Sequence, residues 1–286
     1  MSISIRELLD AGAHFGHQTH RWNPKMKPYI YGARNGIYII DLEKTAALWK
    51  QARQAIVETV MAGSKVLIVG TKPQAQEIVR EEAERAHQHY VNRRWLGGML
   101  TNFKTIKGRI DRLEQLEKTK NSEQAQKLSK KELLTLEKEY VKLEKSLHGI
   151  KNMDRLPGLV IIVDPNKEYI AVSEARKLQI PIVAITDTNC DPDGIDHVIP
   201  ANDDAIKSIR LFLSAATDAC LEGMKAFERR IQEETRKRLE AEAKKQAAKG
   251  DKENGQQTIE TKEVENSSST RAEFMSIQPQ GLGERS

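Results

Sequence analysis

LVIIVD at residues 159–164 and IPIVAITD at residues 180–187 are the stretches that decide the fold of this chain. Both are short and continuous in Val and Ile, as strands buried on both faces of a sheet are. Between them lies a helical pattern whose apolar face carries Ile170, Ala171, Ala175 and Leu178. A strand, a helix and a second strand in this order predict a parallel sheet covered by helices.

The same alternation continues on both sides of this unit. The further strand candidates are GIYIIDL at 36–42, which we expect to be the first strand, KVLIVG at 65–70 and HVIP at 197–200. Amphipathic helices are predicted from Leu42 to Gly63, from Pro73 to Ala86 and onward from about Asp203. The sequence therefore predicts an α/β fold: a three-layer αβα domain with a mainly parallel, flavodoxin-like or Rossmann-like sheet.

Residues 103–150 interrupt the alternation of strands and helices with two apolar stripes at heptad-like spacing. The polar stretch KTKNSEQAQKLS separates the stripes, and Ser129 with Glu132 has the spacing of a capping box that opens the second helix. We expect an inserted antiparallel coiled-coil hairpin whose two apolar stripes cover each other without the main core.

Four parts of the chain follow from these patterns. A discontinuous αβα domain takes residues 1–102 and 151–224, and the hairpin takes residues 103–150. Residues 225–249 keep a helical pattern with few apolar points, which predicts a solvated helix. Residues 250–286 are rich in Gln, Ser, Thr and Glu without periodicity, which predicts a disordered tail.

Composition limits the class of protein. The 286 residues are 38% apolar and 30% charged with a net charge of +5, so nucleic-acid affinity would have to come from local patches. Two isolated cysteines argue against a disulfide framework and for a reducing compartment. The chain begins with a short charged amphipathic helix instead of a signal peptide, and no apolar run approaches the ~20 residues of a membrane span. We expect a soluble cytoplasmic protein with no membrane association.

A first basic segment, YVNRRWLGGMLTNFKTI at residues 90–106, carries cations and an aromatic ring next to a Gly-Gly pair. Residues 92–112 hold six Lys/Arg against one acid. Arginine forks suit phosphate oxygens, and an exposed tryptophan suits unstacked bases. The candidate RNA-binding residues here are Arg93, Arg94, Trp95, Lys104, Lys107 and Arg109.

A second segment of the same character is HFGHQTHRWNPKMKPYI at residues 14–30. Aromatic residues are interleaved with its cations, and two prolines stiffen an extended path. The candidate RNA-binding residues here are Arg21, Trp22, Lys25, Lys27 and, shortly after, Arg34. Trp22 and Trp95 could instead belong to the core. A solvated charged face is the alternative for either segment alone.

His14, His17 and His20 lie three residues apart and invite a zinc interpretation. Zinc needs further ligands, and the only cysteines, Cys190 and Cys220, lack CxxC spacing. A hydrogen-bonding or RNA-facing role is the better interpretation of these histidines. We expect no metal and no cofactor.

Aspartates at the ends of predicted strands are the strongest sign of an enzyme. Asp41, Asp164 and Asp187 each end a strand, where carboxylates can bind Mg²⁺ for phosphoryl chemistry. Helix capping at Asp41 and Asp164 is an equally good explanation. VLIVGTK at 66–72 lacks both GxGxxG and GxxxxGK[ST], so it is weak evidence for a nucleotide.

Four blocks of the chain resemble the signature blocks of the bacterial small-ribosomal-subunit protein S-2 family. They are the two basic segments, RNGIYIIDL at 34–42 and IPIVAITDTNCDPDGIDHVIPANDDAIKSI at 180–209. The resemblance covers about residues 3–225 without gaps. Pro73 departs from the polar residue usual there, which removes one possible phosphate contact.

The resemblance implies a three-layer αβα domain with a protruding coiled-coil hairpin and no catalysis. It also implies a place between the head and body of the small subunit, contacts with small-subunit rRNA and neighbouring ribosomal proteins, late addition during assembly, and support for docking of protein S-1. We expect no homo-oligomer. The alternative from another class is an acid-dependent nucleotide-binding or phosphoryl-transfer α/β enzyme, which would leave both basic segments unexplained.

Overall fold

The predicted parallel sheet is present in the computed structural model, which describes residues 3–120 and 129–274, with side chains described as far as residue 240. Its five strands lie in the order β5-β4-β6-β7-β8, and every neighbouring pair is parallel. They are Val66–Val69 (β4), His89–Val91 (β5), Leu159–Val163 (β6), Ile182–Thr186 (β7) and His197–Pro200 (β8). The two stretches that decide the fold are therefore neighbouring strands inside the sheet, where both faces are covered.

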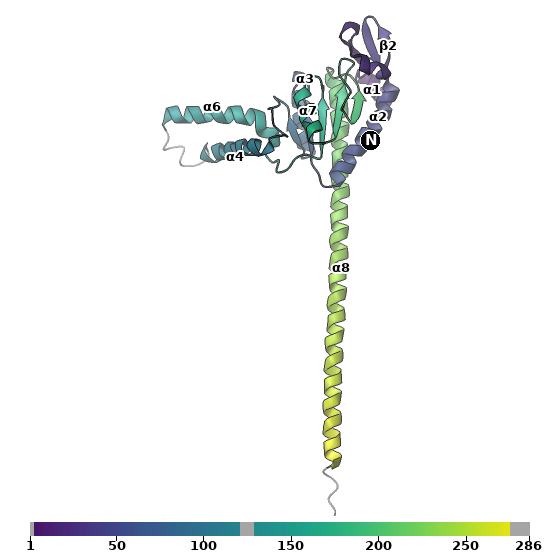
Figure 1. The fold of residues 1–286 in the computed structure, drawn as a ribbon, viewed down its shortest axis with the longest axis vertical. Helices are drawn as coiled ribbons and strands as arrows, with labels where there is room; N and C mark the ends of the chain where they lie inside the picture. The colour runs from purple at the N-terminus through teal and green to yellow at the C-terminus, as the bar shows by residue number, and fades with distance from the viewer. Residues whose placement is uncertain (1–2, 121–128, 275–286) are drawn as a thin grey trace, which may run out of the picture. The chain divides into compact units, whose positions relative to one another are not determined.

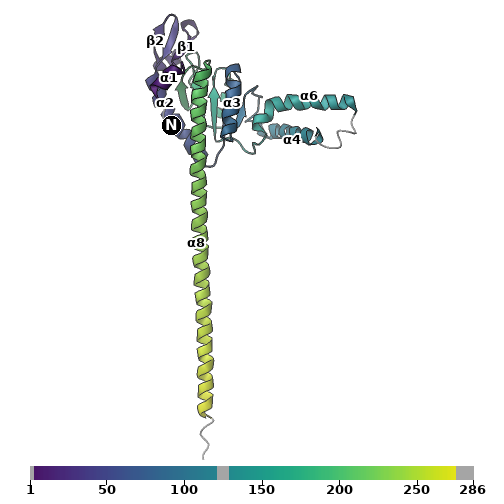
Figure 2. The same cartoon turned by 180° about the vertical axis from the view of Figure 1, so that it is seen from behind.

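Helices cover both faces of this sheet, which confirms the αβα prediction (Figures 1 and 2). They are Leu42–Met61 (α2), Pro73–Arg85 (α3), Tyr169–Lys177 (α7) and the first turns of Ile206–Phe274 (α8). One buried cluster joins Val66 and Ile68 to α2, α3 and α8. Another joins Leu67 and Val69 to α7 on the opposite face. Successive residues of β4 thus enter different cores, as the two-residue period of a strand requires.

Helix α2 follows its sequence pattern closely. Asp41 caps it by accepting hydrogen bonds from the backbone amides of Glu43 and Lys44. One stripe of the helix, at the three- and four-residue spacing of an amphipathic helix, is buried: Leu42, Thr45, Trp49, Ala52, Ile56 and Val60. Gly63 follows the last turn at φ +81°, a conformation that favours glycine. Asp41 is therefore a helix cap in this structure.

The assignment of residues 36–42 as the first strand of the parallel sheet is wrong. Ile37–Ile40 (β3) pairs antiparallel with Phe15–Gln18 (β1) and Ile30–Arg34 (β2) in a separate sheet of three strands. Asn35 and Gly36, both at positive φ, form the two-residue turn between β2 and β3. Asn-Gly is the preferred pair for such a hairpin turn, so the local turn chemistry and not the apolar run decides the pairing.

The three-residue strand β5 has no counterpart in the sequence prediction. It contains only His89, Tyr90 and Val91, and a short strand at a sheet edge gives little periodicity. It matters for function because the first basic segment leaves the sheet from its end.

Residues 103–150 contain the helices Phe103–Lys120 (α4) and Lys130–Leu147 (α6), which lie side by side in both views (Figures 1 and 2). The predicted capping box opens α6. Arg112 and Lys120 of α4 form ion pairs with Glu139 and Glu137 of α6. Residues 121–128 lie outside the described residues, so the connection and the hairpin as a unit stay a prediction.

The expectation that these helices need no other core is wrong. Ile106, Ile110 and Leu113 of α4 and Leu147 of α6 belong to the same buried cluster as β4 and β6. Only the half nearer the sheet shares this core, because apolar residues farther out on α6, such as Leu134, are exposed. The apolar stripe is thus continuous with the core of the sheet domain.

The C-terminal helix differs from its predicted end near residue 249. α8 runs from Ile206 to Phe274, so residues 250–274 are helical where the sequence predicts disorder, and residues 275–286 lie outside the described part. No proline occurs between Pro200 and Pro279, so nothing sterically breaks the helix. The chain divides into a compact unit of residues 1–227 and a second unit of residues 228–286. None of the helices described combines the length and hydrophobicity needed to cross a bilayer.

Candidate functional site

The segment 14–30 presents its cations from two 3-10 turns, Thr19–Arg21 (η1) and Pro24–Tyr29 (η2). Pro24 begins η2, and Asn23 caps it by accepting a 3.0 Å hydrogen bond from the Lys25 amide. Met26 is fully buried and anchors the turn. The flanking basic side chains are exposed, namely Arg21, Lys25, Lys27 and, at the end of β2, Arg34.

Lys25 ties this segment to the loop that follows β7. Its Nζ lies 2.8 Å from Asp191 and 2.5 Å from Asp193. The hydrogen bond to Lys25 holds the pKa of the Asp191 carboxyl below its ordinary value. All three groups are exposed, so solvent screens the attraction. Lys25 therefore offers less free positive charge than the sequence suggests.

The segment 90–106 leaves the sheet from the end of β5. Asn92 donates a 2.8 Å hydrogen bond to the Gln76 carbonyl, and Arg93 donates one of 2.8 Å to the Gln76 side chain. Arg93 and Arg94 are both exposed. The other candidates of this segment, Lys104, Lys107 and Arg109, lie on the first two turns of α4.

Trp95 belongs to the core, which answers the alternative that the sequence left open. It is only 6% exposed, and its indole Nε1 donates a 3.1 Å hydrogen bond to Glu174. A ring covered in this way cannot stack on a base, so the assignment of Trp95 as an RNA contact is wrong. Trp22 is half-buried, with its ring 5.0 Å from that of Tyr38.

The two basic segments both reach the edge of the sheet that is formed by the carboxyl ends of its parallel strands. Lys25 contacts the loop at the carboxyl end of β7, and Arg93 follows the carboxyl end of β5. These strands are three positions apart in the sheet, which corresponds to about 14 Å. The fold thus places cations on both sides of the loops that follow β4 and β6.

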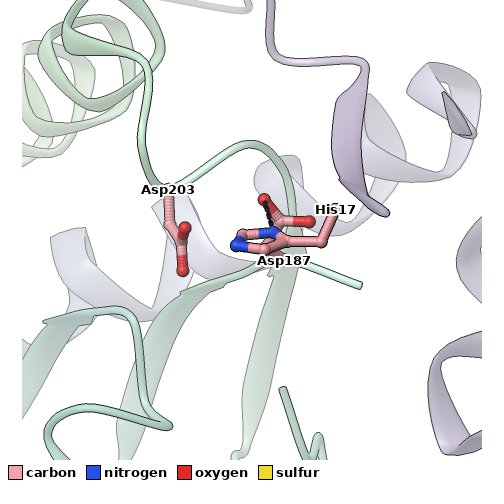
Figure 3. A group of neighbouring side chains, drawn as sticks. All are labelled: His17, Asp187 and Asp203. Atoms are coloured by element: carbon pink, nitrogen blue, oxygen red, sulfur yellow. Dashed lines mark ion pairs between the residues drawn. The ribbon is translucent and has the colours of Figure 1, made fainter. Parts of the chain in front are cut away.

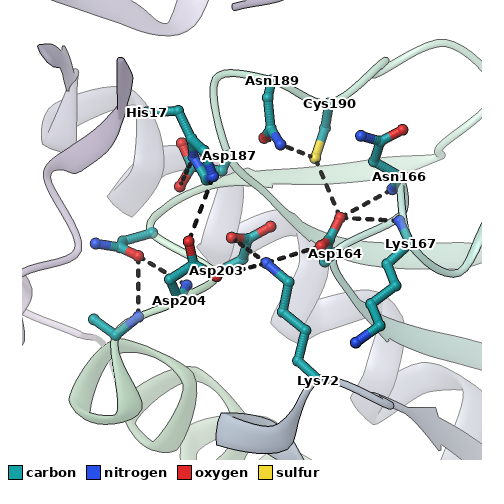
Figure 4. Close-up of polar contacts among 12 residues, drawn as sticks. His17, Lys72, Asp164, Asn166, Lys167, Asp187, Asn189, Cys190, Asp203 and Asp204 are labelled. Atoms are coloured by element: carbon teal, nitrogen blue, oxygen red, sulfur yellow. Dashed lines mark hydrogen bonds and ion pairs between the residues drawn. The ribbon is translucent and has the colours of Figure 1, made fainter. Parts of the chain in front are cut away.

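Those central loops hold a network of charged side chains (Figure 4). Lys72, after β4, lies 2.8 Å from Asp164, 2.7 Å from Asp203 and 2.8 Å from Asp204. Open α/β sheets bind ligands where the strand order reverses, so that the connections leaving two neighbouring strands run to opposite sides of the sheet. Here this point lies between β4, which is followed by β5, and β6, which is followed by β7. In this protein the network of Lys72 lies at that point.

Burial shifts the protonation equilibria of this network. It raises the pKa of Asp203 to about 7, with repulsion from Asp164 and Asp187 adding to the effect and Lys72 opposing it. Burial by itself would lower the pKa of Lys72, but the surrounding carboxylates outweigh it and raise that pKa. The lysine is therefore held as a cation. Its charge compensates the acids, and a buried charge must be paired in this way.

His17, from β1, lies beside Asp187 and Asp203 (Figure 3). Its Nδ1 lies 3.0 Å from Asp187 Oδ2, a contact that is an ion pair when the imidazole is protonated. The interaction with Asp187 raises the pKa of His17 against the effect of burial. Ligand atoms of His17, Asp187 and Asp203 all lie within 4.8 Å of one another.

This trio could hold a divalent cation. One imidazole nitrogen and two carboxylate oxygens are ligands that Zn²⁺ accepts, and Asp203 Oδ2 is buried without a hydrogen-bond partner. A second such group consists of Asp164, Cys190 and Asp203.

The three histidines considered for zinc are not brought together. His14 packs on Phe15 at 4.0 Å between ring centroids, and His20 is exposed. Within the described residues, only His17 of the three joins a group of possible metal ligands. The zinc alternative, which the sequence analysis did not favour, therefore has no support from the placement of these three residues, because spacing along an irregular segment does not determine where side chains converge.

Three residues of this edge are not singled out by the sequence pattern: Lys72, Asp203 and Glu174. Asp203 follows β8 as Asp164 and Asp187 follow their strands, so its position was a usable signal. Glu174 had the weaker signal of an acid on the same helix face as the apolar residues Ala171 and Ala175.

Residues 8–223 match the family model described as ribosomal protein S2. The chain belongs to this family. It is 57% identical over 243 residues to the small ribosomal subunit protein uS2 of Lawsonia intracellularis. That match covers 85% of this chain and 82% of the relative. It is 58% identical over 234 residues to the protein of the same name from Geotalea uraniireducens, with 82% and 91% covered. For the uS2 of Sorangium cellulosum the identity is 59% over 221 residues, with 77% and 80% covered.

Membership makes the chain a structural protein of the small ribosomal subunit that takes part in translation in the cytoplasm. Its sequence resemblance to the S2 family is thereby confirmed.

Proposed function

We propose that this S2-family protein binds small-subunit rRNA through its two basic segments, next to other ribosomal proteins at the junction of head and body. It acts as a single copy without catalysis or membrane contact, and it supports docking of the small-subunit protein S-1. Phosphate contacts would supply most of the affinity, as they do for nucleic-acid interfaces in general.

One observation carries this proposal: most cations of the two basic segments, with Arg34 beside them, remain available. In the described part of the chain no ion pair engages Arg21, Lys27, Arg34, Arg94, Lys104 or Arg109, and all six are exposed. By contrast, Lys25 and Lys107 are paired with Asp191 and Asp154. Exposed cations without partners attract an anionic polymer at no cost of breaking an internal pair.

The structure of the central loops favours this function over a phosphoryl-transfer enzyme. Carboxylates that would hold Mg²⁺ in such an enzyme, Asp164 and Asp203, are bound by Lys72. Glu168 accepts hydrogen bonds from Thr71, which closes the neighbouring turn. The strand ends are thus cross-linked to one another, as suits a scaffold.

The double variant Arg93→Ala/Arg94→Ala tests the proposal. We expect weaker binding to small subunits that lack this protein, and a shallower dependence of the logarithm of affinity on the logarithm of KCl concentration. Removal of one bound phosphate from the interface should reduce the magnitude of the slope by about 0.7–0.9. The free energy of unfolding should change by less than about 1 kcal/mol, because both side chains are exposed.

Lys50→Ala/Lys207→Ala is the matched control, since it removes two exposed cations outside both segments. It should leave the salt dependence nearly unchanged. An unchanged slope in the Arg93/Arg94 variant, or equal effects in both variants, would refute phosphate binding by these arginines.

A further inference from the structure

Glu174 of α7 is a buried carboxylate that is bound almost wholly by one loop. It is 7% exposed, and its two oxygens accept five hydrogen bonds from the loop that follows Arg94. The donors are the indole of Trp95 (3.1 Å), the amides of Gly98 (2.7 Å), Leu100 (2.9 Å) and Thr101 (3.0 Å), and the Thr101 hydroxyl (3.1 Å).

Such a set of donors requires an anion of fixed shape. Three backbone amides converge on Glu174, so without its carboxylate they would be left without an acceptor in a covered site. Burial would raise the pKa of Glu174, but the hydrogen bonds from the loop outweigh it and lower that pKa. The carboxylate therefore stays charged and holds the loop in one conformation.

The loop conformation itself depends on this contact. Gly98 has φ +83°, and a Cβ there would lie 3.2 Å from the Cβ of Asn102. The chain turns sharply at this point, so that the indole of Trp95 before the turn and the amides of Gly98, Leu100 and Thr101 all face Glu174. The backbone amides of a segment without a regular hydrogen-bond ladder need such a side-chain acceptor when the segment is covered.

Arg93 and Arg94 lie between two anchors. On one side, Asn92 donates a hydrogen bond to the Gln76 carbonyl. On the other side, Trp95 is buried and bound to Glu174. The arginine side chains are exposed while the backbone on either side of them is held.

We infer that Glu174 is a positioning residue for RNA binding: it fixes the loop 95–101 so that Arg93 and Arg94 are presented together toward phosphate. This inference rests on the proposed function for the role of the two arginines. Glu174 itself does not touch the RNA. Holding a binding segment in its bound shape before contact reduces the ordering cost of association.

Glu174→Gln tests the inference, because it removes the charge and keeps the size of the side chain. Glu82→Gln is the matched control, since Glu82 is also a buried helical carboxylate, and its partner is Arg85 outside the loop. Amide hydrogen exchange comes first and needs no RNA. We expect exchange at Gly98, Leu100 and Thr101 to accelerate in Glu174→Gln and to stay at the wild-type rate in Glu82→Gln.

Binding to small subunits that lack the protein comes second, with all variants compared at equal folded fraction. Glu174→Gln should bind about tenfold to a hundredfold more weakly and show a shallower salt dependence, because fewer phosphates would be neutralised. In the background Arg93→Ala/Arg94→Ala, adding Glu174→Gln should cost less than about twofold, because the groups that it positions are gone.

If Glu174 only stabilised the fold, the exchange and binding measurements would give other results. Protected amides at Gly98, Leu100 and Thr101 in Glu174→Gln would overturn the inference. A loss of affinity that adds fully to that of the arginine variant would also overturn it. If the arginine variant alone binds like wild type, the proposed function fails, whereas the exchange data still decide whether Glu174 holds the loop.

Discussion

The two buried charged groups near the carboxyl ends of the strands, Glu174 and Lys72, each have their own stabilising partners, and the partners differ in kind. Glu174 is compensated by hydrogen-bond donors of one loop, whereas Lys72 is compensated by carboxylates that follow two other strands. The first arrangement orders a local segment, and the second connects the ends of β4, β6 and β8. Each can be tested by removing one group.

Replacing Glu174 by Gln should destabilise the protein in a pH-dependent way. At neutral pH we expect a loss of about 1–3 kcal/mol in the free energy of unfolding, because amides lose a charged acceptor. The folded-state pKa of Glu174 lies below its ordinary value of 4.5, so the carboxylate stabilises above that pH and stops doing so as the pH falls through the folded-state pKa. Urea unfolding of both proteins across this range should show the difference shrinking toward acid pH. A difference that is constant with pH would contradict the assignment.

Replacing Lys72 by Met should cost more. The change leaves Asp164 and Asp203 buried beside each other without their cation, and breaking a buried pair costs about 3–5 kcal/mol. Lys167→Met is the control, because the Lys167 side chain is exposed and its amine lies 3.4 Å from the Thr71 carbonyl, whereas its backbone amide, which bonds Asp164, is kept in the variant. Equal unfolding midpoints for the two variants would show that Lys72 does not compensate these acids.

In the helices α4 and α6, local sequence pattern determines where each helix forms, and tertiary packing determines which core its apolar residues join. Their apolar stripes and the capping box at Ser129 were predictable because heptad spacing and capping are local properties. That Ile106 and Ile110 continue into the core of the sheet was not, because it depends on what α4 meets after folding.

The substitution Ile110→Ala separates a shared core from a self-contained one. Ile110 is 3% exposed in the cluster that includes β4 and β6, so the cavity should cost about 2–5 kcal/mol of global stability. Amide exchange of β6 should then accelerate together with that of α4. Leu134→Ala serves for comparison, since Leu134 is 62% exposed and its truncation should be nearly neutral. Loss of protection restricted to α4 and α6 would show that the core is not shared.

For the whole molecule, the sequence predicts the helices and strands that have long apolar patterns. It misses the elements that depend on a turn of two or three residues and the sites where distant side chains come together. The central strands β6 and β7 and the helix α2 were recognisable because buried runs and stripes are strong signals. The antiparallel hairpin at Asn35–Gly36 depended on two residues, and β5 on three. At the candidate site, exposure of Arg93 and Arg94 was predictable from charge, but burial of Trp95 was not, since an indole suits both a core and a base.

Sedimentation of the native protein with ribosomal particles tests the central claim most directly. The account predicts that the protein sediments with small subunits at about one copy per subunit in low salt, and that Arg93→Ala/Arg94→Ala is released at lower KCl concentration than wild type. Recovery of the wild-type protein at the top of a low-salt gradient, free of small subunits, would contradict it.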